Sequence, residues 1–190
     1  MKNKKNIIFI LLSELICFTI TNISLISYTN SVYSFGMNLI QCFYFLPIFI
    51  CSFYSFLSKQ SNRTILLIST SIFILYSVFL HVGIEQITTF FTSLPGTIHF
   101  VVYASKIYYI ALPLLGFRIL MLKKEATKKA AFLMLLKIIF LLFITILLKH
   151  FFQLKGVLYS LPLSELIFMF TLLILSKKNA TIIFKLPEKV

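Results

Sequence analysis

Long runs of apolar residues are the feature that most constrains how this chain folds. Six runs occur, at residues 6–28, 36–57, 64–83, 98–122, 130–149 and 156–176. Each is long enough to cross a hydrocarbon layer of ~30 Å as an α-helix, which rises about 1.5 Å per residue. The connections between the runs are short and carry polar or helix-breaking residues. The sequence therefore predicts one all-α domain over residues 1–190, a polytopic membrane protein with six transmembrane helices.

The composition excludes an ordinary soluble protein. Hydrophobic residues make up 59% of the chain and charged residues only 12%, and the runs are apolar on all sides rather than amphipathic. The net charge of +13 would suggest nucleic-acid binding in a soluble protein, but the lysines lie at the ends of the apolar runs. Cys17, Cys42 and Cys51 lie inside these runs without a CxxC pair or a zinc-binding spacing. We therefore expect small apolar cysteines, and neither a metal site nor a cofactor.

The positive charges predict the orientation of the chain. Thirteen of the 18 lysines and arginines lie at one set of helix ends, and the opposite loops carry only Lys149 and Lys155. Because positive residues favour the cytoplasmic side, both termini are predicted to be cytoplasmic, in a multi-pass protein of the plasma membrane. The first run is longer than the apolar core of a signal peptide and is expected to remain as a helix. Residues 85–95 are too short to span and are expected to lie at the outer interface.

Four charged residues lie inside the runs, near the middle of the bilayer at helical rise: Glu14, Lys106, Lys137 and Glu165. Such charges cost several kcal/mol unless they are paired, neutralised or exposed to water. Two are acidic and two basic, so they could form ion pairs across the bundle. The functional hypothesis is a polar centre that couples an ion to a substrate. The alternative is a set of structural salt bridges, or lysines that extend to the interface.

Three prolines interrupt the second, fourth and sixth runs: Pro47, Pro113 and Pro162. Each removes a backbone hydrogen bond, frees a carbonyl and bends its helix, which is common where transporters hinge. The alternative is that they only shape helix packing, since proline is frequent in membrane helices.

Catalytic combinations of residues are mostly missing from the sequence. The chain contains no Asp, so neither an Asp dyad nor a Ser-His-Asp triad can form. Cys42 and His81 are the one pair whose expected depths would suit an intramembrane cysteine peptidase. We do not expect an enzyme.

Several segments resemble, in the same order, the C-terminal half of MATE multidrug and toxin extrusion transporters. They are residues 13–18 (SELICF), 43–48 (FYFLPI), 89–95 (TFFTSLP), 110–116 (IALPLLG), and 154–158 (LKGVL) followed by 161–165 (LPLSE). The first matches the family's seventh helix, where a membrane-embedded Glu is followed four residues later by Phe. The resemblance implies one six-helix lobe of a twelve-helix, two-lobed transporter. The helix at 110–116 lacks the acid that several bacterial members carry there, which favours H⁺ over Na⁺ as the coupling ion.

The resemblance implies efflux of amphipathic or cationic organic compounds, driven by H⁺ or Na⁺ exchange at Glu14. An apolar cavity would be lined by aromatic residues, here Phe18, Tyr44, Phe45 and Tyr108, although such residues more often face lipid or pack between helices. Because one lobe cannot enclose a cavity, a second copy or a separate N-terminal lobe would be required. The alternatives are an accessory or immunity-type membrane protein, and a truncated remnant without transport activity.

Overall fold

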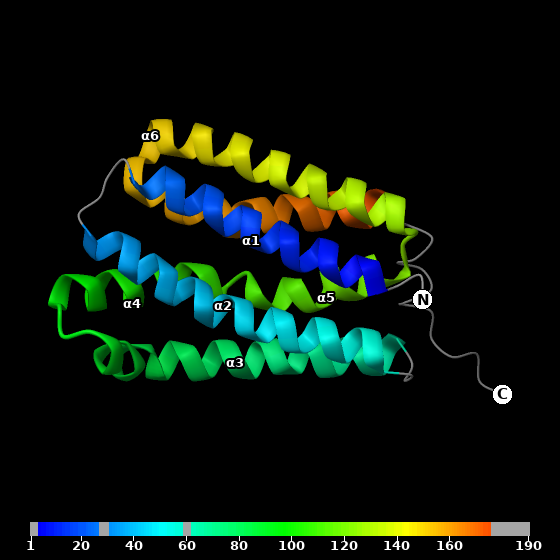
Figure 1. Ribbon diagram of the computed structural model, residues 1–190, viewed down its shortest axis with the longest axis horizontal. Coiled ribbons are helices and arrows are strands. Elements are labelled where there is room, and N and C mark those ends of the chain that lie inside the picture. Colours follow the sequence, from blue (N-terminus) through cyan, green and yellow to red (C-terminus); the bar gives the residue numbers. More distant parts are fainter. Residues whose placement is uncertain (1–3, 27–30, 59–61, 176–190) are drawn as a thin grey trace.

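The computed structural model describes residues 4–26, 31–58 and 62–175, and all secondary structure in these ranges is α-helical. The helices are α1 (Lys4–Ile26), α2 (Ser31–Leu57), α3 (Asn62–Phe91), α4 (Pro95–Tyr109), α5 (Leu112–Lys124) and α6 (Thr127–Leu175). They lie side by side along one long axis (Figure 1). The described part of the chain begins and ends at the same end of this bundle, at Lys4 and Leu175.

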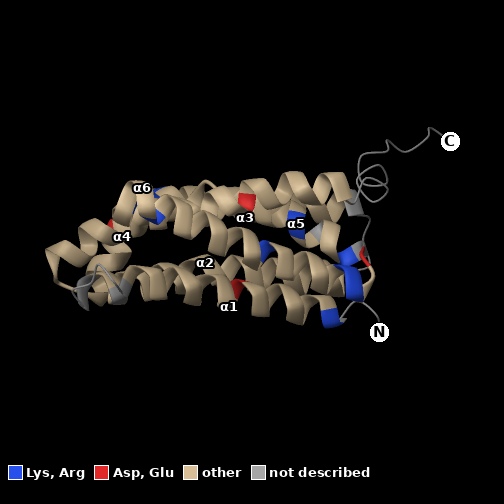
Figure 2. Cartoon of the chain, turned by 90° about the horizontal axis from the view of Figure 1, so that it is seen from above, with Lys and Arg blue, Asp and Glu red and all other residues tan. Residues whose placement is uncertain are grey.

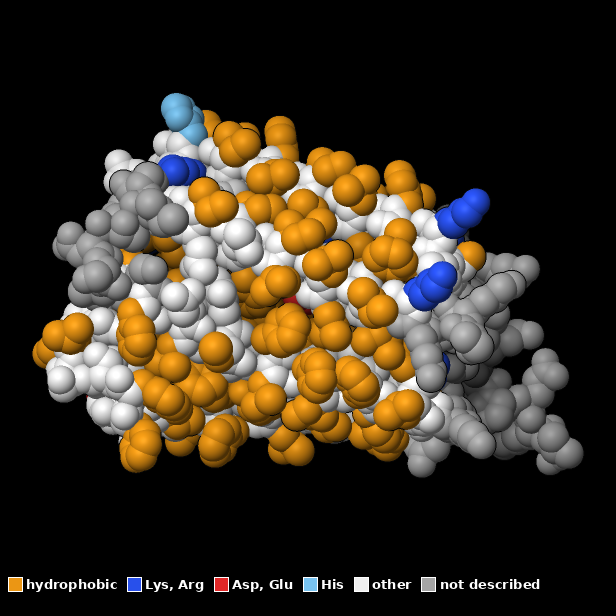
Figure 3. Space-filling view, in the orientation of Figure 1, with side chains coloured by type: hydrophobic (Ala, Val, Ile, Leu, Met, Phe, Trp, Pro, Cys, Tyr) orange, Lys and Arg blue, Asp and Glu red, His pale blue; other side chains and the backbone are white. Residues whose placement is uncertain are grey.

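The helices have the length and composition of a membrane-embedded protein. Four of them, α1, α2, α3 and α6, are long and apolar enough to cross a membrane, and α4 and α5 together form a fifth candidate, bent by 44°. Apolar side chains cover much of the outer surface (Figure 3). Lys and Arg are concentrated at the end where the described chain begins (Figure 2). A lipid environment accounts for this combination, because water would not solvate so large an apolar surface.

Helix α6 is a hairpin of two helical halves. Gln153, with φ 51° and ψ −128°, is the non-helical residue inside it, and the chain folds back there (Figure 1). A Cβ atom at Gly156 would lie 2.5 Å from the carbonyl carbon of Leu148 and would collide with its oxygen. Because this neighbour is backbone, a larger residue cannot be accommodated at Gly156 without moving one half of the hairpin. The first half contains the predicted run 130–149, and the second contains the predicted run 156–176 as far as Leu175; residue 176 lies outside the described residues.

Two predicted segments differ from the structure. The run 98–122 is divided between α4 and α5, with Ile110 and Ala111 between them. The segment 85–95, expected as a separate interfacial piece, instead contains the last turns of α3, which ends at Phe91. The prediction of a separate piece was wrong, because α3 continues through Gly83 to Phe91 and a single glycine inside a helix is tolerated. Its position at the outer interface stays a prediction.

Helix α5 lies in the centre of the bundle, in contact with α1, α2, α3 and α6. Gly116 permits its close approach to α3, since a Cβ there would lie 3.3 Å from the backbone nitrogen of Thr70. At the end of α5, the Asn6 side-chain amide donates to the carbonyls of Leu122 (3.0 Å) and Glu125 (3.1 Å). The Leu122 carbonyl also accepts from the Glu125 N–H at 3.2 Å, and the two Asn6 contacts tie α1 to the C-terminal end of α5.

Helix α3 satisfies two of the carbonyls that the prolines leave free. Pro47 lacks the N–H that would pair with the carbonyl of Phe43, and the Tyr76 hydroxyl donates to that oxygen at 2.9 Å. Pro113 likewise frees the carbonyl of Tyr109, to which the Ser77 hydroxyl donates at 3.4 Å. Adjacent residues of one helix therefore stabilise the proline sites of two others, as unpaired backbone groups in lipid require.

We expect Tyr76→Phe to lower the stability of the protein by about 1–3 kcal/mol, because it leaves the Phe43 carbonyl without its donor. Thermal unfolding of the purified protein in detergent measures this effect. Tyr33→Phe is the matched control, since the Tyr33 ring packs on Phe100 with a centroid distance of 4.9 Å and phenylalanine keeps that contact. Equal unfolding temperatures for the two variants would contradict the assigned role of Tyr76.

Candidate functional site

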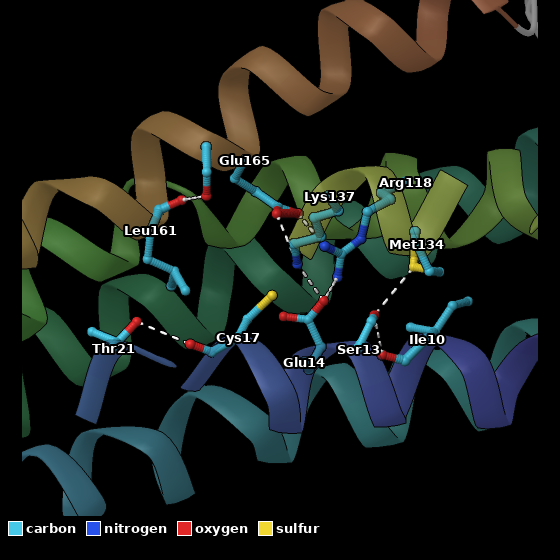
Figure 4. Close-up of polar contacts among 11 residues, drawn as sticks. Ile10, Ser13, Glu14, Cys17, Thr21, Arg118, Met134, Lys137, Leu161 and Glu165 are labelled. Carbon is cyan, nitrogen blue, oxygen red and sulfur yellow. Dashed lines mark hydrogen bonds and ion pairs between the residues drawn. The ribbon is translucent and has the colours of Figure 1, made fainter. Parts of the chain in front are cut away.

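Four charged side chains meet in the middle of the bundle and form a closed charge ring (Figure 4). Its members are Glu14 of α1, Arg118 of α5, and Lys137 and Glu165 from the two halves of α6. Acids and bases alternate around it, so each carboxylate faces two cations. All four side chains are at most 1% exposed.

The contacts around the charge ring use three of its four carboxylate oxygens. Oε1 of Glu14 accepts a hydrogen bond from Lys137 Nζ at 2.5 Å and lies 2.5 Å from Arg118 Nη2. Oε1 of Glu165 accepts from Arg118 Nη1, and its Oε2 lies 3.0 Å from Lys137 Nζ. Two negative and two positive charges balance, so the ring is neutral as a whole.

Helix geometry explains how α5 supplies the guanidinium. Arg118 lies at the middle of α5, and side chains of an α-helix lean toward its N-terminus. The long Arg118 side chain therefore extends from the charged end of the bundle toward its middle, where Glu14 and Glu165 lie. The Gly116 contact with α3 holds the same turn of α5 in place.

Burial makes the ring costly to break. Charges removed from water lose their hydration, and only close pairing offsets that loss. Deletion of one member leaves an unbalanced charge in an apolar interior, which typically costs about 3–5 kcal/mol. The ring therefore fixes the relative positions of α1, α5 and both halves of α6.

Several buried polar atoms, some of them on ring members, have no hydrogen-bond partner within the described ranges. They include Glu14 Oε2, Arg118 Nε, the Tyr108 hydroxyl and the Thr145 hydroxyl. Buried polar groups are almost always paired, and exceptions concentrate where a protein binds water, ions or ligands. Among these atoms, Glu14 Oε2 is the carboxylate oxygen. An exchangeable proton or cation would require such an oxygen.

The structure brings together three of the four charged residues that the sequence singled out. Glu14, Lys137 and Glu165 are members of the ring, whereas the Lys106 side chain is exposed on α4. Arg118 takes the position in the ring for which Lys106 was expected. The sequence did carry a signal for Arg118, since it is an arginine inside the fourth apolar run.

The prolines lie at two kinds of position. Pro113 follows the bend between α4 and α5, in the first turn of α5. Pro47 and Pro162 lie inside α2 and α6, which continue through them. Their role as hinges stays a prediction.

The aromatic residues expected in a cavity divide between the core and a groove. Phe18 packs edge-on against Tyr44 with a centroid distance of 5.1 Å, and Tyr44 against Tyr108 at 6.1 Å, all three buried. Phe18 and Phe45 also line a groove of about 580 Å³ between α1 and α2. The groove begins beside Glu14, because Leu15 forms part of its wall, and Asn38 and Gln41 add amide groups.

The cysteines and histidines form no metal site in the part of the chain that the structure describes. Cys17 and Cys51 are buried, whereas Cys42 of α2 and His81 of α3 are both exposed.

Comparison of the chain with protein-family models, curated proteins and solved structures found no match.

We expect Arg118→Met to destabilise the protein by about 3–5 kcal/mol, because it leaves two buried carboxylates facing one lysine. The balanced double variant Arg118→Met/Glu14→Gln keeps the pair of Lys137 and Glu165 and should recover much of this loss. Thermal unfolding in detergent measures both variants, with Lys106→Met as the exposed control.

Equal destabilisation by Arg118→Met and Lys106→Met would contradict the structural role of the ring. The role would also be contradicted if the double variant lost as much stability as Arg118→Met and Glu14→Gln lose together when each is measured alone. Members of one ring must be energetically coupled, so their losses should not add.

Proposed function

We propose that this chain is one six-helix lobe of a MATE-type transporter in the plasma membrane, with both termini in the cytoplasm. It would export amphipathic or cationic organic compounds in exchange for H⁺ or Na⁺. The observation that carries the proposal is the charge ring with its unpartnered Glu14 oxygen, in the middle of an apolar bundle. Ionisable groups at such a depth commonly belong to ion pathways.

The helix arrangement is compatible with six spans. Helices α4 and α5 would cross the membrane together as one bent span, and the halves of α6 would cross as two antiparallel spans. Lys123, Lys128 and Lys129 lie near the end of the bundle where α1 begins, as expected for a cytoplasmic side. His150 lies near the α6 turn at the opposite end.

Substrate binding would use the groove between α1 and α2. Aromatic rings at Phe18 and Phe45 suit the apolar part of an amphipathic compound, and the amides of Asn38 and Gln41 suit its polar part. Exchange at Glu14 would act on the same helix, because Leu15 and Phe18 of the groove follow Glu14 by one and four residues in α1. A second copy or a separate N-terminal lobe would cover this face to enclose the substrate.

A specific observation favours an alternative, an accessory or immunity-type membrane protein. Every member of the ring is paired with two opposite charges, which a purely structural cross-link between helices also requires. A truncated remnant without transport activity would retain the same cross-link. Transport assays and the particle mass distinguish these alternatives from an exporter.

We expect Glu14→Gln/Lys137→Met to abolish gradient-driven efflux of an organic dye cation from proteoliposomes, because it removes the exchanging carboxylate. The matched variant is Lys137→Met/Glu165→Gln, which removes the same number of charges but keeps Glu14 paired with Arg118. It should keep efflux at least about tenfold above the first variant, which corresponds to ~1.4 kcal/mol.

The same preparations should give particles of twice the 22.0 kDa chain mass in native lipid discs, or particles with a second multi-helix chain. Monomeric particles without efflux would support the accessory or remnant alternatives. Equal efflux by the two double variants would exclude Glu14 as the coupling residue.

The six-span topology predicts opposite accessibility for two engineered cysteines, in a background with Cys17, Cys42 and Cys51 replaced by Ala. A membrane-impermeant maleimide should label His150→Cys in intact cells, and Lys128→Cys only after permeabilisation. Both native side chains are exposed, so access depends on the side of the membrane. Labelling of both cysteines from the same side would contradict the arrangement.

A further inference from the structure

A lateral groove of about 440 Å³ lies between the end of α4 and the second half of α6. Its apolar wall is formed by Ile107, Ile110, Phe152, Pro162, Leu163 and Leu166. Lys155 and Tyr159 line the same groove nearer the α6 turn. The volume is within the ~300–1,000 Å³ of ligand sites. The groove surface is therefore almost wholly apolar, with a lysine side chain at the end nearer the α6 turn.

Lys106 adds a second positive charge to this face. It lies one helical turn before Ile110, and residues four apart in a helix are neighbours on its surface. The Lys106 side chain is exposed at a position inside the apolar run of α4, where an unpaired ammonium group is costly. A lysine there can extend along the helix toward the polar interface or can pair with an anion.

A tyrosine pair connects the two helices beside the groove. The side chains of Tyr103 in α4 and Tyr159 in α6 lie close enough to interact. Lys106 follows Tyr103 by three residues, and Lys155 precedes Tyr159 by four, so both lysines lie within about one turn of this contact. From their positions, both lysine side chains can extend toward the polar interface, where lysines and tyrosines commonly meet lipid headgroups.

We propose that this groove binds one anionic phospholipid. An acyl chain would lie along the apolar wall down to Leu166, and the headgroup phosphate would contact Lys155 and Lys106. Charge complementarity selects this occupant, because two lysines adjoin an apolar groove of a membrane-embedded protein. Among the described residues, no acid lines the groove, and the nearby Glu165 is buried in the charge ring, so neither lysine is neutralised there. The proposal depends on membrane placement but not on transport.

Native mass spectrometry of the full chain tests the proposal. Protein reconstituted in phosphatidylcholine with a minor fraction of phosphatidylglycerol is released into detergent, and the retained lipids are counted. We expect the wild type to retain one phosphatidylglycerol in preference to phosphatidylcholine. Lys155→Gln and Lys106→Gln should each lower this preference about fivefold, as expected for a lysine near an anionic headgroup.

Three further variants separate the site from general charge effects. Lys128→Gln removes an exposed lysine at the other end of the bundle and should leave the preference unchanged. Lys155→Arg keeps the charge and should preserve the preference. Leu163→Trp fills the groove and should lower retention of both lipids, which tests the apolar wall even where Lys106→Gln fails to fold.

Three outcomes would overturn the proposal. The first is equal retention of both lipids by the wild type. The second is a loss of preference in Lys128→Gln as large as in Lys155→Gln, which would indicate nonspecific charge attraction. The third is a lipid-free dimer that Leu163→Trp dissociates, because a second copy of the chain would then occupy the groove.

Discussion

The arrangement of the bundle depends on four charges that are stable only together. Glu14, Arg118, Lys137 and Glu165 would each be costly in an apolar interior, and their mutual pairing removes most of that cost. Apolar packing alone specifies helix positions in lipid weakly, because a lipid tail and a leucine side chain are similar neighbours. The charge ring supplies the specificity that such packing lacks, since a shift of one helix would separate an ion pair.

The ring also limits how the site can work. Since each carboxylate already faces two cations, a cationic substrate cannot simply occupy an empty negative site. It must compete with Arg118 or Lys137, or must use the unpartnered oxygen of Glu14. In a MATE-type mechanism, a change in helix packing would therefore have to accompany a change in the protonation of Glu14.

Helix α3 takes no part in the ring, yet it supports the helices around it. Its adjacent hydroxyls at Tyr76 and Ser77 donate to the carbonyls that Pro47 and Pro113 leave free. The backbone next to each of these prolines is thus held by a hydrogen bond from a neighbouring helix. The Tyr76 and Ser77 side chains would have to release these carbonyls if α2 or α5 pivoted.

Apolar length and helical rise were enough to locate the helical segments and to place Glu14, Lys137 and Glu165 at similar depths. They did not predict which charge of the fourth run enters the centre. Membrane helices are apolar toward lipid and toward protein, so hydrophobic periodicity carries little information on which side faces inward. Lys106 lies at the same level as the central charges but on the exposed side of α4. Arg118 lies twelve residues later in the run, and its long side chain reaches the centre. The last turns of α3 were missed because the third apolar run was ended at Gly83, whereas the helix continues to Phe91.

The α6 hairpin has a consequence for biogenesis. Its two halves carry Lys137 and Glu165, and Lys137 Nζ lies 3.0 Å from Glu165 Oε2. Each of these charges therefore has a counter-ion within the hairpin, even before α1 or α5 packs against it. Within the hairpin, the buried charges of Lys137 and Glu165 can therefore neutralise each other before the ring is complete. Glu14 has no such partner within α1. It therefore lacks its counter-ion Arg118 until α5 has been synthesised. The last of the described helices therefore carries an internal ion pair, and its Lys137 completes the pairing of Glu14 in the first.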